Sequence, residues 1–116
     1  MAHLEKKNFN APDERRTPPN TTIETVRFGD RTVSRVTYNP GWRWTKDVKP
    51  VVGTDLCQVN HFVYVVSGRT HVVMADGTEI ELGPGDTGTV PAGHDGWVVG
   101  DEPCVFIDFG GAARPD

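Results

Sequence analysis

Residues 57–93 read CQVNHFVYVVSGRTHVVMADGTEIELGPGDTGTVPAG, and this stretch decides the fold. Side chains alternate between the two faces of a strand, so an extended segment after residue 56 sorts its residues into two sets. One face then carries Cys57, Val59, His61, Val63 and Val65. A valine-rich face usually packs inward. We therefore expect the thiol of Cys57 and the imidazole of His61 to face a core or a cavity.

The rest of the chain reads as short strands separated by turns of Gly, Pro, Asp and Asn. The Asp76-Gly77 pair is typical of a hairpin. If residues 42–44 are extended, Trp42 and Trp44 share one face, and residues 46–53 are expected to form a solvated loop. No segment shows sustained helical periodicity. About nine short strands at close spacing predict an all-β sandwich or barrel.

Length and composition predict a single domain. The chain has 116 residues, 36% of them hydrophobic, and a net charge of −4, which disfavours a nucleic-acid partner. The longest apolar run, residues 62–66, is far too short to span a membrane. The N-terminus carries charge where a signal peptide needs an apolar segment, and two cysteines make no disulfide framework. We expect a cytoplasmic protein with reduced thiols and no membrane partner.

The polar residues at both ends of the chain predict that it has three parts. Residues 1–20 are polar and contain prolines, so they are expected to form a flexible or extended arm. Residues 21–110 would form the barrel, and residues 111–116 a frayed tail.

The motifs within this barrel resemble those of the cupin superfamily. Gly85, Pro91 and Gly93 fit the second cupin motif, G-x5-P-x-G-x2-H-x3-N, and Gly68 fits the closing glycine of the first, G-x5-H-x-H-x3,4-E-x6-G. The resemblance implies an all-β double-stranded β-helix, a jelly-roll barrel of one domain, and it makes a homodimer the default expectation.

The usual cupin metal ligands do not carry over. By the motif spacing, Asp55 and Cys57 stand where cupins have their first two histidines, His61 stands where they have glutamate, and Gly96 replaces the last histidine. A site of three histidines and one glutamate therefore cannot be claimed.

The residues that stand at or near the usual ligand positions still suggest a metal site. His94 lies two residues before Gly96 and so points to the same side of an extended segment. Cys57, His61 and His94 could hold a divalent metal with one open position, as catalytic zinc sites do, and Asp55 is a possible fourth ligand. Thiolate favours zinc, iron, nickel or copper over magnesium or manganese.

Three functions remain open from these residues. The resemblance implies a small metal-dependent enzyme of the dioxygenase, isomerase or lyase class. Alternatively, the barrel is a metal-free ligand-binding or regulatory module in which His61 is a core histidine or lines a pocket. A third hypothesis makes Cys57 a nucleophile with His61 as its base, but four residues of strand separate them by about 13 Å unless a bulge intervenes. Cys104 is interpreted as a small apolar core residue.

A small organic molecule is the expected ligand in each case. Aromatic side chains at the mouth of a barrel can close over a planar ligand. The predicted pocket residues are Trp42, Trp44, Val59, Val63 and Trp97.

Phe62 and Tyr64 are expected on the outer face as inter-sheet or dimer contacts, and His71 is expected to face outward.

Overall fold

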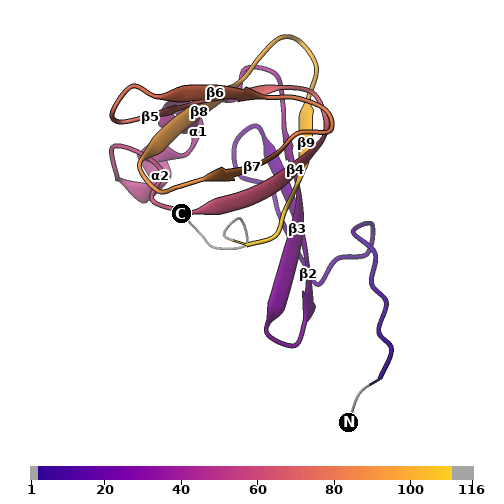
Figure 1. Ribbon diagram of the computed structural model, residues 1–116. Helices are drawn as coiled ribbons and strands as arrows, with labels where there is room; N and C mark the ends of the chain where they lie inside the picture. The colour runs from indigo at the N-terminus through magenta and orange to yellow at the C-terminus, as the bar shows by residue number, and fades with distance from the viewer. Residues whose placement is uncertain (1–2, 111–116) are drawn as a thin grey trace.

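The computed structural model describes residues 3–110, and these fold into two antiparallel sheets that enclose a barrel (Figure 1). The expected tail at residues 111–116 lies outside the described part. The larger sheet has the order β1-β2-β3-β9-β4-β7. Its strands are β1 (Glu14–Arg16), β2 (Thr21–Phe28), β3 (Arg31–Tyr38), β9 (Cys104–Asp108), β4 (His61–Ser67) and β7 (Thr87–Val90). The smaller sheet has the order β6-β5-β8, with β6 (Glu79–Leu82), β5 (Thr70–Met74) and β8 (His94–Val98). The all-β jelly-roll prediction is confirmed.

The hydrophobic core lies between the two sheets. The inward positions of β4 and β9 supply Val63, Val65, Cys104 and Phe106, which are all buried. Phe62 and Tyr64 occupy the outward positions of β4 and are 55% and 41% exposed. They are available on the surface, while the expected homodimer stays a prediction.

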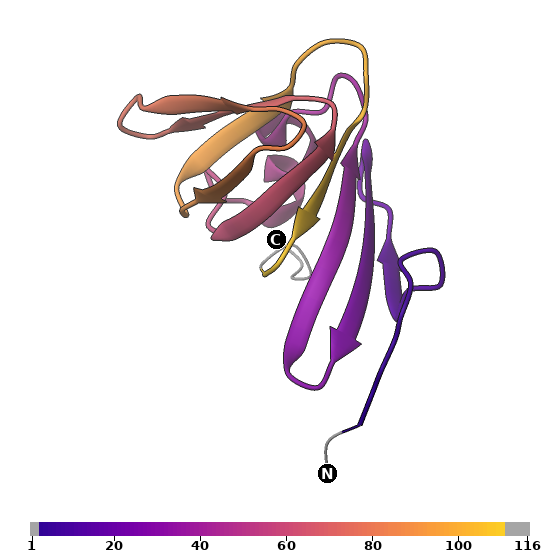
Figure 2. The same ribbon diagram turned by 45° about the vertical axis from the view of Figure 1, so that its right-hand side comes forward.

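The N-terminal residues join the larger sheet through a short strand. Strand β1 lies within the expected arm and pairs with β2, with Glu14 opposite Thr25. Before β1, the chain runs away from the barrel alongside the projecting β2–β3 hairpin (Figures 1 and 2). Asp13 anchors this segment, because its carboxylate accepts hydrogen bonds from the backbone of Arg27 and from Lys7.

The extended conformation considered for residues 42–44 holds only as far as Arg43, which pairs with Trp97, and the expected loop at residues 46–53 is wrong. Two one-turn helices occupy this region, α1 (Trp44–Asp47) and α2 (Lys49–Val52). Pro50 lies in the first turn of α2, where its missing N–H costs no hydrogen bond, and Gly53 ends the helix at φ 81°. These helices are too short to show periodicity in the sequence. Among residues 3–110, no helix has the length and apolar character needed to cross a membrane.

Gly68 fixes the turn between β4 and β5 by close backbone packing. Its φ is +75°, and a Cβ there would lie 2.2 Å from the carbonyl oxygen of Pro103. The closing glycine of the first motif is therefore required both by its conformation and by the space around it.

We expect Gly68→Ala to lower the free energy of unfolding by about 3 kcal/mol, because it adds a backbone clash to left-handed strain. Gly29→Ala is the matched control: Gly29 has φ +61°, but a Cβ there would have no atom within 4 Å, so we expect a loss of about 1 kcal/mol. Urea denaturation measures both. Equal losses in the two variants would contradict the packing argument.

Candidate metal centre

Cys57, His61 and His94 come together where the two sheets meet. One ligand atom from each residue lies within 4.8 Å of the others. His61 begins β4 in the larger sheet and His94 begins β8 in the smaller one. Cys57 is tied to His94 by an isolated backbone bridge, in which the Cys57 N–H donates to the His94 carbonyl at 2.8 Å.

The expectation that Cys57 and His61 lie on one continuous strand is wrong. Strand β4 begins only at His61, and residues 58–60 are irregular. The chain therefore folds back over these residues, and the Cys57 Sγ lies 3.8 Å from the His61 Nε2 instead of four strand residues away. Because this segment is irregular, the separation of about 13 Å expected along a regular strand does not apply, and the two side chains can contact each other directly.

Each histidine is oriented by its other ring nitrogen. His61 Nδ1 lies 2.7 Å from Oδ2 of Asp108, and His94 Nδ1 lies 2.7 Å from the carbonyl oxygen of Pro91. A carbonyl only accepts hydrogen bonds, so the His94 Nδ1 must carry the donating proton. Both rings consequently turn Nε2 toward the cluster, as metal-binding histidines do.

Charge in the cluster favours a thiolate. Burial alone would raise the pKa of the Cys57 thiol, but hydrogen bonding with His61 and His94 outweighs burial and lowers the pKa to about 7. Burial likewise opposes protonation of His61, whereas Asp108 and Cys57 raise its pKa to about 9. Near neutral pH in the metal-free protein, His61 is thus mostly protonated and Cys57 is partly ionised.

Cys104 differs from Cys57 in chemistry. Burial raises the pKa of the Cys104 thiol to about 11, only partly offset by a hydrogen bond with Thr70. Neither cysteine forms a disulfide. The protonated, buried thiol of Cys104 suits the core role expected from the sequence.

Asp55 and Gly96 do not join the three clustered side chains. The Asp55 side chain is 98% exposed and pairs with Lys49 across 3.5 Å. At Gly96 a Cβ would lie 3.2 Å from the His71 carbonyl oxygen, so a larger residue there is crowded. On β8, His94 is the buried residue that faces the cluster.

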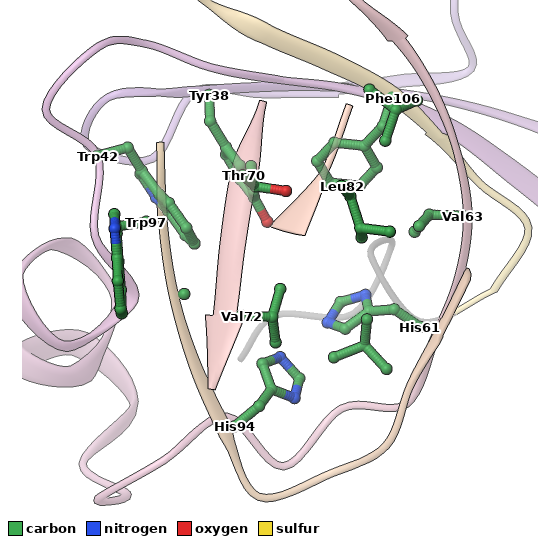
Figure 3. A pocket seen from close by; sticks show the side chains of 13 residues that line it. Tyr38, Trp42, His61, Val63, Thr70, Val72, Leu82, His94, Trp97 and Phe106 are labelled. Carbon is green, nitrogen blue, oxygen red and sulfur yellow. The ribbon is translucent and has the colours of Figure 1, made fainter. Parts of the chain in front are cut away.

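Two cavities meet at the cluster. The inner one, of about 50 Å³, runs between the sheets, and the outer one, of about 560 Å³, opens beside β1–β3 and the two helices. His61 and His94 line both cavities, whereas Cys57 lines only the outer one. Figure 3 shows the two imidazoles close together at one end of the inner cavity, with Tyr38 and Thr70 toward the other end.

The predicted pocket residues occupy different places around these cavities. Trp42 lines both cavities, Val63 the inner one and Trp44 the outer one. Trp97 borders the inner cavity, but its ring stacks on His71 at a centroid distance of 4.8 Å, on the outward face of β8. Val59 packs against the core and lines neither cavity.

Sequence reasoning missed Asp108. Its side chain is almost completely buried on the inward face of β9, in step with Cys104 and Phe106. The available signal was an acidic residue at the third inward position of an apolar strand, since such a residue needs a buried partner.

The family model for the cupin domain matches residues 58–110, which include most of the barrel strands and two of the three cluster residues. This match and the barrel fold support the cupin assignment made from the sequence. The chain is similar to solved structures at low identity. A protein of unknown function from Rhizobium leguminosarum bv. viciae has a TM-score of 0.64 and 20% identity, with 93% of this chain and 98% of that chain covered.

Enzymes are among the similar structures. The polyketide cyclase RemF from Streptomyces resistomycificus has a TM-score of 0.63 and 21% identity, with 91% of this chain and 78% of the cyclase covered. The Lactobacillus farciminis oxalate decarboxylase, solved as a formate complex, has a TM-score of 0.59 and 17% identity, with 91% of this chain and 33% of that chain covered. No curated protein matches the sequence. At these identities the likeness shows the fold alone.

We expect the metal-free protein to show a thiolate transition near pH 7 from Cys57 and another near pH 11 from Cys104, followed by ultraviolet thiolate absorbance. His61→Ala should move the lower transition upward, because burial still opposes the thiolate while the hydrogen bond from His61 is lost. Cys104→Ser is the control that removes only the upper transition. An unchanged lower transition in His61→Ala would show that His61 does not stabilise the thiolate.

Proposed function

We propose that this protein binds a small organic molecule beside a divalent transition metal held by Cys57, His61 and His94. The observation that carries the proposal is the convergence of one sulfur and two nitrogen ligand atoms within 4.8 Å. Zinc, iron, nickel and copper all accept thiolate and imidazole ligands.

The donor set fits such an ion. Both histidines have their Nδ1 atoms engaged, by Asp108 and by the Pro91 carbonyl, which leaves Nε2 as the ligand atom on each ring. Three protein ligands leave a coordination position for water or substrate. A metal bound there supplies Lewis acidity, which polarises a carbonyl or activates water.

The cavities supply the space for the organic ligand. The outer cavity has a volume typical of small-molecule sites, and apolar residues such as Ile23, Val36 and Trp44 form much of its wall. The ligand we propose is therefore mostly apolar, with one polar atom directed at His61 and His94. A metal-dependent dioxygenase, isomerase or lyase is the proposed class, and enzymes among the similar folds support it only by analogy.

A metal-free ligand-binding module is the second candidate. It is favoured by the contacts that already satisfy the cluster: Cys57 interacts with His61, and His61 interacts with Asp108. In that case the same cavities hold the ligand and the cluster supplies hydrogen bonds.

Elemental analysis separates the two candidates. We expect purified untagged protein to contain a near-stoichiometric transition metal, and His61→Ala and His94→Ala to lose it, because each change removes one of three ligands. His71→Ala and Asp55→Asn are the matched controls. His71 lies on the outward face of the smaller sheet and Asp55 is exposed, so both variants should retain the metal.

A chelator provides the second arm of the test. If the metal supports the fold, removing it should lower the midpoint of thermal denaturation, and adding back ZnCl2 should restore it. Absence of metal after reconstitution with zinc, iron, nickel and copper, together with an unchanged midpoint, would reject the metal centre and favour the binding module.

A further inference from the structure

We infer that Asp108 is the positioning residue of the metal centre, holding His61 in the orientation and tautomer that present Nε2 to the ion. This inference rests on the proposed metal function and adds a fourth residue to it. Asp108 contacts the ring of His61 on the side away from the proposed ion, so it would act through His61.

The surroundings of Asp108 make its contact with His61 a specific one. The residue is 1% exposed and lies on β9, where β3 and β4 flank it with Ser34 and Val63 in register. A carboxylate in such a place needs hydrogen-bonding partners, because burial without them is costly. Oδ2 is 2.7 Å from His61 Nδ1, and Oδ1 accepts the backbone N–H of Gly110 at 2.9 Å.

Gly110 and His61 contact different oxygens of the Asp108 carboxylate. The Gly110 N–H holds one carboxylate oxygen, which fixes the rotation of the carboxyl group. The other oxygen then holds the Nδ1 proton of His61, which fixes the ring plane and leaves Nε2 facing Cys57 at 3.8 Å. A carboxylate at Nδ1 also makes the imidazole a stronger ligand than a neutral acceptor does.

The second histidine provides an internal comparison. His94 Nδ1 is held by a backbone carbonyl, which no side-chain substitution removes. His61 is the ligand whose orientation depends on a replaceable side chain. Its partner lies on a different strand of the larger sheet, whereas Pro91 is only three residues from His94.

Competition of Zn2+ between the protein and a chromogenic chelator tests the inference. We expect Asp108→Asn to weaken zinc binding roughly 10- to 100-fold, since the acceptor oxygen is retained but its charge is lost. Glu24→Gln is the control: it disrupts the ion pair with Arg35 on β2 and β3, away from the cluster, and should leave zinc affinity unchanged. In a His61→Ala background, Asp108→Asn should have no further effect on zinc affinity.

A second pair of variants alters the contact of Asp108 without changing Asp108 itself, so the test does not depend on the folding of Asp108→Asn. Gly110→Pro removes the N–H that holds Oδ1, whereas Gly110→Ala keeps it, and no atom lies within 4 Å of a Cβ built at Gly110. We expect weaker zinc binding only in Gly110→Pro. The visible spectrum of the Co2+ form should shift in Gly110→Pro and Asp108→Asn, because the geometry and strength of the His61 ligand change.

The outcomes distinguish the inference from the function on which it rests. If the unmodified protein binds no zinc, the metal function fails and the role of Asp108 fails with it. If the unmodified protein binds zinc and Asp108→Asn binds equally well, only the role of Asp108 is overturned. That role is also overturned if Asp108→Asn weakens binding as much without His61 as with it, because Asp108 would then support the fold in general.

Discussion

The buried hydrogen bond between His61 and Asp108 is the contact on which the site depends. It joins the first residue of β4 to the last residue of β9, in the interior of the larger sheet. The carboxylate needs a donor there, because burial without one is costly. The imidazole therefore cannot rotate away without depriving Asp108 of that donor. This requirement fixes the orientation of one of the three clustered side chains.

The backbone bridge between Cys57 and His94 completes the cluster from the other side. His94 belongs to the smaller sheet and His61 to the larger one, so the cluster spans the seam between them. Cys57 reaches both because the chain before β4 is irregular. A regular strand would have carried the thiol away from the imidazole. The site thus depends on where β4 begins as much as on which residues it contains.

The sequence predicted the barrel and three members of the cluster, but not their geometry. Turn glycines such as Gly68 and the alternation along β4 are local signals, and they identified the strands and their inward faces. The position at which a strand starts depends on its pairing partners, so the break before His61 was not visible locally. Asp108 was missed for a similar reason. Its partner is 47 residues away, and only the β4–β9 pairing brings the two together.

The clustered histidine on β8 stands at a different position from the histidine of the family motif. Gly96 stands where the family motif has histidine, and the carbonyl of His71 and the ring of Trp42 lie close to the space a side chain would need. His94 is on the same face, two residues nearer the start of β8. His94 therefore lies where the segment before β4 supplies Cys57 and the outer cavity begins. His94 and the irregular segment at residues 58–60 together bring the three clustered side chains to the junction of the two cavities.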